Sequence, residues 1–198
     1  WGVTHVVVHN SADPEAYLPY TGEIASGLRV ANHITSKRVF LAWDFHEEAL
    51  AGLPVRIVGH NPDMPNVEAA AEWDDLKRML STHRFLVHTA DPRFEDGFNM
   101  SVLEAMAAGM PVLANRHPTS IVQHGVTGFL GDSPAEMRAH AERLLLDVDL
   151  ACELGANARR HIERNFSADR FRVEFTRGLQ EARKKWARRR GRAPAPAR

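Results

Sequence analysis

The chain has 198 residues, of which 44% are hydrophobic, and it carries equal numbers of acidic and basic residues. This length and composition suffice for a globular domain with a substantial core. No apolar run reaches about 18 residues and no signal peptide is recognisable, so we expect neither a membrane span nor secretion. Cys152 is the only cysteine, which excludes an internal disulfide bond and favours the reducing cytoplasm.

The neutral total charge hides an uneven distribution. Residues 183–198 contain eight Lys or Arg and no acid, which leaves 17 basic against 25 acidic residues in the rest of the chain. An acidic body argues against a nucleic-acid-binding protein. The basic end is either a solvated tail, with Ala-Pro repeats typical of disorder, or a contact with an anionic membrane surface.

The N-terminal residues are expected to form a strand and a turn. Thr4–His9 is a short apolar run, and the Asn, Asp and Pro that follow indicate a turn. We therefore predict a linker at residues 1–20, a domain at 21–182 and a basic, disordered tail at 183–198. Because the first residue is Trp1 rather than Met, we expect a processed, excised or incomplete chain.

Two strands and two helices are predicted next. Leu28–Asn32 is predicted to be the first strand, and Ser36 the N-cap of the helix that follows. Pro54–Gly59 is the second strand, and the next helix begins after Glu72. The first helix is expected to bury Phe40, Trp43, Ala49 and Leu50, and the second Trp73, Leu76, Met79 and Leu80.

The stretch Glu95–Ser120 holds the most informative pattern. Arg84–His88 is an apolar run typical of a strand, Asp91–Asn99 has the Pro, Gly and Asn of a loop, and Ser101–Gly109 indicates a helix. Pro111–Ala114 is then the next strand. In such a unit the two strands are parallel, and ligands bind beyond their carboxyl ends, where the helix begins. The sequence therefore predicts a ligand site in this loop.

Two carboxylates lie near the start of this helix. Asp96 is in the loop and Glu104 is in the first turn, so both could face one crevice. Backbone N-H groups at a helix start attract anions such as phosphate, and carboxylates accept hydrogen bonds from sugar hydroxyls. The residues alone leave a second interpretation open, in which Ser101 and Glu104 form a capping box or Glu104 is simply solvated. The apolar face of the helix is expected to contain Val102, Leu103, Met106 and Met110.

Three more helices are predicted in the last third of the chain. Ser133-Pro134-Ala135-Glu136 offers an N-cap, a Pro at the first helical position and a Glu at the third, so a helix runs towards Asp147. Leu150–Asn165 should be another. The last helix carries three apolar residues at four-residue spacing, which pack on the domain or stay partly exposed. These residues are Phe171, Phe175 and Leu179.

The stretch Glu95–Ser120 strongly resembles the donor-binding motif of retaining glycosyltransferases of the GT-B fold, in particular glycosyltransferase family 4. The family pattern is Glu-Gly-Phe-Gly, three variable residues, then Leu-Glu-Ala-Met-Ala-x-Gly-x-Pro-Val. This sequence has Asp96-Gly97-Phe98-Asn99, followed by LEAMAAGMPV at Leu103–Val112. Asp96 thus replaces the first Glu of the family's Glu-x7-Glu pair, unless Glu95 supplies it with a shift of one residue, and Asn99 replaces a Gly.

Other segments extend the resemblance. Asn32-His33-Ile34 corresponds to the family's Gly-Arg-Leu, and Lys37-Arg38 lies where the family has a lysine that helps to hold the donor diphosphate. His33 exchanges a permanently charged bidentate arginine for a side chain that is mostly neutral near pH 7. Gly125–Leu130 matches the family's Gly-Val-Thr-Gly-Leu-Leu turn and strand, and Phe166-Ser167 resembles the Phe-Ser that opens the last helix.

The resemblance implies a doubly wound, Rossmann-like parallel α/β domain, the second half of a GT-B fold, that binds a nucleoside-diphosphate sugar. Glu104 would bind the ribose and Asp96 the hydroxyls of the donor sugar. His33, Lys37 and Arg38 would bind the diphosphate. The implied reaction transfers a glycosyl group with retention of configuration, without a metal or another cofactor. The implied backbone contacts to sugar and phosphates come from Gly97, Phe98, Asn99, Met100 and Ser101.

The acceptor-binding half of such an enzyme would lie upstream, so we expect the isolated chain to bind the donor but transfer little sugar. Two alternatives stay open: a non-catalytic nucleotide-sugar-binding module or partner subunit, and an epimerase on the same double fold. We expect no metal site, because His46-Glu47-Glu48 lacks the second His of His-Glu-x-x-His and there is no Cys cluster. The expected location is the cytoplasm, with peripheral contact to an anionic membrane as the alternative for the basic tail.

Overall fold

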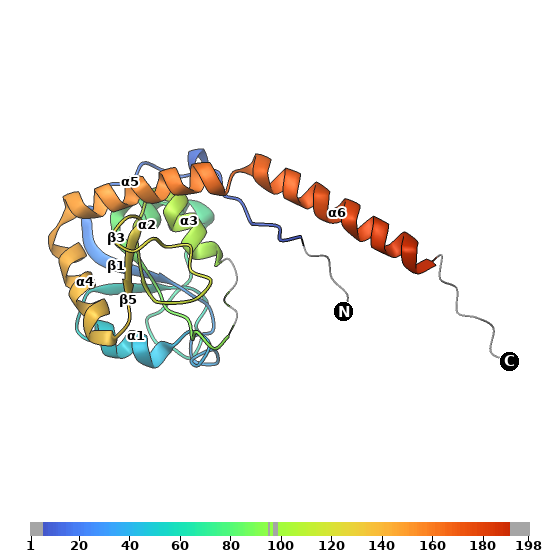
Figure 1. Cartoon of the computed structure of the whole chain (residues 1–198). Coiled ribbons are helices and arrows are strands. Elements are labelled where there is room, and N and C mark those ends of the chain that lie inside the picture. The colour runs from blue at the N-terminus through green and yellow to red at the C-terminus, as the bar shows by residue number, and fades with distance from the viewer. Residues whose placement is uncertain (1–5, 95, 97–98, 191–198) are drawn as a thin grey trace.

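The computed structural model describes residues 6–94, 96 and 99–190. Within these residues, five parallel strands form one sheet in the order β2-β1-β3-β4-β5, with helices on both faces (Figure 1). The predicted doubly wound, Rossmann-like α/β fold is confirmed. The strands are β1 (Ile24–Val30), β2 (Val55–Val58), β3 (His83–His88), β4 (Val112–Asn115) and β5 (Gly128–Gly131). The helices are the 3-10 helix η1 (Pro14–Ala16), α1 (Trp43–Leu50), α2 (Trp73–Thr82), α3 (Met100–Ala108), α4 (Pro134–Leu146), α5 (Val148–Asn165) and α6 (Ala168–Arg190).

The central strands are buried on both faces of the sheet, as parallel strands between helices require. In β3, Leu86 packs in the cluster formed with α2, α3 and α5. Phe85 and Val87 pack in the cluster formed with α1 and α4. The register places Leu28, Leu86 and Val112 in one row across the sheet. Continuous apolar runs in the sequence therefore correspond to alternating contacts with two helical layers.

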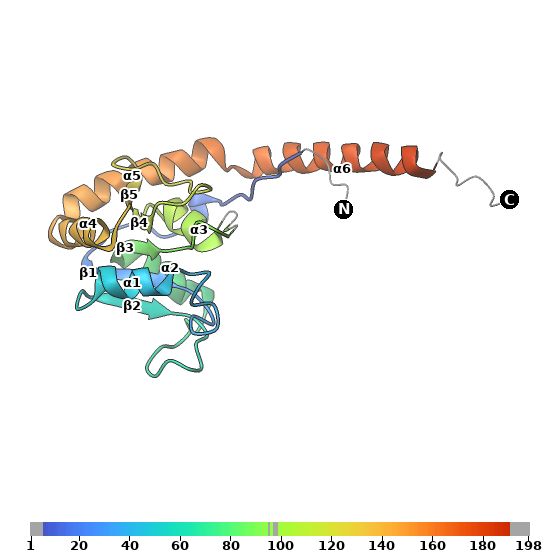
Figure 2. The same cartoon turned by 60° about the horizontal axis from the view of Figure 1, so that its bottom comes forward.

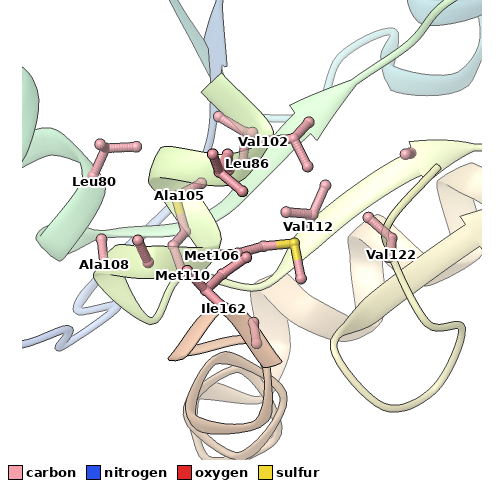
Figure 3. Close-up of a cluster of buried hydrophobic side chains, with 14 of the residues drawn as sticks. Leu80, Leu86, Val102, Ala105, Met106, Ala108, Met110, Val112, Val122 and Ile162 are labelled. Carbon is pink, nitrogen blue, oxygen red and sulfur yellow. The ribbon is translucent and has the colours of Figure 1, made fainter. Parts of the chain in front are cut away.

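Helix α3 is buried over most of its surface, between the sheet and α5. Figure 3 shows Met106 beside Val112 and Ile162, within the larger of the two core clusters. Gly109 ends the helix as predicted, with a left-handed φ of 85° that glycine adopts without a Cβ clash. The N-H of Met110 then donates to the carbonyl of Ala105 at 2.8 Å. This tight end brings the chain directly into β4.

Two predictions near the N-terminus are wrong. The expected strand at Thr4–His9 is absent from its described part, residues 6–9, which have no regular secondary structure. These apolar residues pack on α6 instead, since Val8 lies beside Gly178. β1 begins four residues before the predicted start, and its first half, IASG, contains a Ser and a Gly that hide it from a search for apolar runs.

Helix α1 begins later than predicted. Ser36 does not cap it, because its hydroxyl donates to the carbonyl of His33 at 3.1 Å. The chain forms turns up to Ala42, whose left-handed φ of 44° prevents an earlier helix start. The helix therefore starts at Trp43, and Phe40 is exposed rather than part of a buried helix face.

Helix α2 begins after Glu72, as predicted, and buries Leu80. Trp73, which we expected in the core, is 47% exposed. It is the first residue of the helix, and its ring lies edge-on to Tyr17 of the N-terminal segment, 6.2 Å between centroids, rather than against the sheet. Helical spacing identifies a face of the helix but does not show how far along the helix that face is covered.

Helix α6 extends from the body of the domain, and the N-terminal segment runs beside its first half (Figures 1 and 2). The N-H of His9 donates to the carboxylate of Glu174 at 2.8 Å. Phe175 and Leu179 are each 48% exposed, so part of the apolar face does remain open to solvent.

The basic end of the chain is partly helical. Residues 183–190, which we predicted as part of a disordered tail, continue α6, because Lys, Arg and Ala are strong helix formers. Residues 191–198 lie outside the described residues. Among those that are described, no helix is long and apolar enough to cross a membrane.

Candidate functional site

The candidate site lies at the carboxyl ends of the strands. β1 leads to β2 on one side of the sheet, whereas β3 leads to β4 on the other, so the topological switch point falls between β1 and β3. The loops after these two strands are joined there. The Thr89 hydroxyl donates to the carbonyl of Leu41 at 2.6 Å, and the N-H of Asp91 donates to the carbonyl of Phe40 at 2.9 Å.

Asparagine side chains fix the neighbouring loops. The Asn61 amide accepts from the N-H of Ile34 and donates to the carbonyl of Ala31, both at 2.8 Å, which ties the loop after β2 to the loop after β1. Asn115 makes the corresponding pair of hydrogen bonds with the N-H and carbonyl of Ala90, at 2.9 and 2.8 Å. Because each amide satisfies backbone groups of another loop, the edge of the sheet is held in one arrangement.

Asp96, the predicted sugar ligand, is half-buried at this edge. Its Oδ2 lies 2.7 Å from Nε2 of His88, the last residue of β3. The carboxylate lines a small pocket with His88, Asn99 and His117. Burial alone would raise the pKa of Asp96, but the hydrogen bond from His88 and the nearby His117 and Asn99 side chains hold it below its usual range. Asp96 is therefore ionised at neutral pH.

Glu104, the predicted ribose ligand, is half-buried on α3. Burial raises the pKa of Glu104, and its charge contributes to the raised pKa of Tyr17 in the N-terminal segment. Burial is the only cause of the shift at Glu104, and among the described residues no side chain or N-H group donates a hydrogen bond to the carboxylate. Glu104 is not among the residues that line the small pocket beside Asp96.

The start of α3 is capped by Asn99. Its Oδ1 accepts from the N-H of Ser101 at 3.1 Å, from the N-H of Val102 at 3.4 Å and from the Ser101 hydroxyl at 2.9 Å. The capping box between Ser101 and Glu104 is therefore wrong as an interpretation, because the cap lies two residues earlier. Met100 is exposed at the first position of the helix. The N-H groups predicted to face a phosphate are thus partly occupied by an internal amide.

The three predicted diphosphate ligands are exposed in the loop between β1 and α1. His33 has a left-handed φ of 55°, and its ring lies 5.2 Å from that of His60. Arg38 is paired with the carboxylates of Asp44 and Glu47, each at 2.5 Å. Lys37 forms no ion pair within the described part of the chain. Of the two residues with a permanent charge, Lys37 and Arg38, only Lys37 can therefore bind a ligand without breaking an ion pair among the described residues.

Gly97 and Phe98, two of the predicted backbone contacts, and Glu95, the alternative carboxylate, lie outside the described residues. Over residues 6–94, 96 and 99–190, no group of three or more His, Cys, Asp or Glu side chains is arranged to hold a metal ion.

A buried arginine that no sequence motif indicated lies below the crevice. Arg29 is 1% exposed, and its guanidinium donates to the carbonyls of Val87 and Thr89, each at 3.2 Å. Its Nε has no partner in the described structure. Burial lowers the pKa of Arg29 to about 10, and the charge of Asp96 opposes that shift. The sequence feature that could have indicated this buried charge is the single Arg within the apolar run Leu28-Arg29-Val30.

The fold and site define a doubly wound α/β domain with carboxylates beside its switch-point crevice. The sequence model of the family described as Glycosyl transferases group 1 matches residues 45–147. The chain belongs to this family.

Curated relatives match over shorter stretches. Glycosyltransferase 1 domain-containing protein 1 of Xenopus tropicalis is 30% identical over 95 residues, which cover 47% of this chain and 27% of that protein. Sucrose synthase 2 of Pisum sativum is 38% identical over 81 residues, 38% of this chain and 10% of that protein. The matches thus span only about a quarter or a tenth of these longer proteins.

Solved structures share the fold over most of this chain. HepE from Anabaena, in complex with UDP and glucose, superposes with a TM-score of 0.69 at 16% identity, covering 88% of this chain and 56% of that chain. The C-terminal domain of LpcC, a glycosyl transferase group 1 family protein from Francisella tularensis, superposes with a TM-score of 0.60 at 14% identity, covering 80% of this chain and all of that domain. At these identities the likeness establishes the fold alone.

Proposed function

We propose that this chain is the donor-binding domain of a retaining glycosyltransferase and binds a nucleoside-diphosphate sugar. The observation that carries this proposal is the carboxylate of Glu104. It is half-buried, lies outside the helix cap and accepts no hydrogen bond from the described residues. Partial burial without a partner among the described residues costs free energy, and hydrogen bonds from ligand hydroxyls would offset that cost. Family membership and the UDP bound to HepE support a nucleotide as the ligand.

In this proposal Glu104 accepts hydrogen bonds from the ribose, and Asp96 accepts them from the donor sugar. Lys37 interacts with the diphosphate, because its ammonium group forms no ion pair with any residue that the structure describes. Stabilising the negative charge that develops on the departing diphosphate would assist transfer. Gly97 and Phe98 keep the backbone role that the family resemblance implies.

Transfer also needs a surface that binds the acceptor. We propose that an upstream half supplies it and that the isolated chain therefore transfers little sugar. The match covers 56% of HepE, so a second region of similar size accompanies this fold in that protein. The exposed apolar residues of α6, Phe175 and Leu179, are candidates to contact such a half.

A non-catalytic nucleotide-sugar-binding module is the second candidate function. Three observations favour it: His33 stands where the family has Arg, Arg38 is paired with two carboxylates, and the Asn99 amide occupies the start of α3. Each of these three features weakens the binding of a diphosphate but leaves the proposed contact between Glu104 and ribose in place. Such a module would bind the donor but would not transfer sugar even when an upstream half is supplied.

The test is calorimetry with UDP, GDP and ADP on the wild-type chain and on Glu104→Gln. At least one nucleotide should bind to the wild type. In the variant, loss of a charged acceptor should weaken binding of that nucleotide by about 1.5–3 kcal/mol, or roughly tenfold to a hundredfold. Stability should change by less than about 1 kcal/mol, because the carboxylate takes no part in the cap.

Glu153→Gln is the matched control, since Glu153 is exposed on α5, away from the carboxyl edge of the sheet. It should leave both affinity and thermal midpoint unchanged. A wild-type chain that binds none of the three nucleotides at millimolar concentration contradicts the proposed function. Unaltered affinity in a well-folded Glu104→Gln chain would remove Glu104 from the site.

A further inference from the structure

Asp96 is held by a side chain at the end of the neighbouring strand. His88, at the end of β3, contacts Oδ2 at 2.7 Å. Asn99, directly before α3, lines the same small pocket as this carboxylate, and its Oδ1 caps the helix. The carboxylate is thus tied to the end of the sheet and lies beside the capped start of α3. An ionised carboxylate has about four acceptor sites, so acceptor capacity remains for a ligand.

The protonation state of the pair follows from its surroundings. Burial lowers the pKa of His88, and the charges of Arg29 and His117 lower it further, while Asp96 opposes the shift. These groups come from β1, from the loop after β4 and from the loop after β3. His88 is therefore neutral near pH 7. Because Asp96 is ionised and can only accept, the Nε2 of His88 carries the proton and donates it in the hydrogen bond.

We propose that His88 is a positioning residue that fixes Asp96 for the hydroxyls of the donor sugar. Asp96 is one methylene shorter than the Glu of the family pattern, so its carboxylate reaches less far from the backbone. The hydrogen bond from His88 at the end of β3 compensates, because it holds that shorter side chain at the edge of the crevice. The inference rests on the proposed function and assigns His88 to the sugar part of the donor, not to the nucleotide part.

The experiment separates these two parts by measuring the affinity for UDP and for UDP-glucose, and in parallel for GDP and GDP-mannose. Within a pair, the Kd of the free nucleotide divided by the Kd of the nucleotide sugar reports what the sugar contributes to binding. His88→Leu removes the hydrogen-bond donor to Asp96 and should reduce this ratio about tenfold, the effect of one hydrogen bond. The affinity for the free nucleotide should change little. His88→Gln keeps an N-H donor and should restore most of the sugar contribution.

His161→Leu is the control, because His161 is a half-buried histidine on α5 whose ring lies 5.7 Å from that of Phe166 and which does not line the small pocket beside Asp96. It should leave the ratio unchanged. If His88→Leu weakens nucleotide and nucleotide sugar equally, or if His88→Gln gives no rescue, the role of His88 is structural and the inference is wrong. If neither nucleotide nor nucleotide sugar binds to the wild type, the proposed function fails and the inference fails with it.

Discussion

Individual polar side chains shape the carboxyl edge of this sheet. Asn99 stands where the family pattern has Gly, and its amide caps α3 where a glycine would leave the helix start open. Arg29 and His46 are both buried, and neither Nε of Arg29 nor Nδ1 of His46 has a partner in the described structure. His46 stacks on Trp43 with 4.2 Å between ring centroids. Such groups make stability depend on pH.

Replacing His46 by Phe should reduce the loss of stability in mild acid. Burial and the charge of Arg29 lower the pKa of His46 to about 3. In the unfolded chain this imidazole takes up a proton near pH 6.5, whereas in the folded chain it does not until much lower pH. The unfolded state then binds more protons, so the free energy of unfolding falls as pH drops below 6.5, by at most about 1.4 kcal/mol per pH unit.

Urea unfolding of wild type and His46→Phe at pH 7 and pH 5 checks this expectation. The variant should gain stability relative to wild type between the two values, while other buried histidines continue to contribute equally in both proteins. Parallel pH dependence of the two chains would mean that His46 is protonated in the folded state.

At the scale of elements, the contact between α3 and α5 decides how closely the helical layer packs. Gly109 ends α3, and its carbonyl faces Gly155, the eighth residue of α5. A Cβ built on Gly155 would lie 1.9 Å from that carbonyl oxygen. The two backbones therefore approach as closely as they do only because residue 155 has no side chain.

Gly155→Ala should destabilise the domain by about 1–3 kcal/mol, the usual cost of forcing an extra group into a packed interior. The matched control is Gly178→Ala in α6, where a new Cβ would meet Val8 at an ordinary 3.6 Å. That change should be neutral or stabilise by up to about 1 kcal/mol, because Ala is a better helix former. Thermal unfolding of both variants gives the comparison. Equal midpoints for the two would show that α5 moves away without cost.

For the molecule as a whole, the arrangement of α6 sets it apart from the rest of the domain. It extends beyond the sheet with the N-terminal segment alongside, and its last residues are basic (Figure 1). Glu181, paired with Lys184 at 2.9 Å, is the last acidic residue in the sequence. Arg183–Arg192 contains seven Lys or Arg together with Trp186, which is exposed.

We expect this basic segment to bind weakly to vesicles that contain anionic lipid, since each well-placed charge contributes roughly 1 kcal/mol at such a surface. Sedimentation with vesicles of phosphatidylserine and phosphatidylcholine should show binding that falls as salt rises. A chain truncated before Arg183 should lose it, and vesicles of phosphatidylcholine alone should bind neither chain. Equal sedimentation of the full and truncated chains would identify the segment as a solvated end.

The sequence by itself determined the features that depend on a few neighbouring residues. Ser133 caps α4 and Gly109 ends α3 as predicted, because capping and left-handed ends are satisfied within one turn of chain. The motif around Asp96 and Glu104 likewise indicated the family and, through the order of strand, helix and strand, the doubly wound sheet.

Only the tertiary structure decided which side chains meet and where irregular backbone interrupts a pattern. The contact of His88 with Asp96 depends on how the loop after β3 folds back, and the burial of Arg29 depends on the helical layer above β1. The late start of α1 follows from left-handed backbone at His33 and Ala42. Non-glycine residues adopt that conformation only when surrounding contacts hold them in it, so their own sequence gives no sign of it.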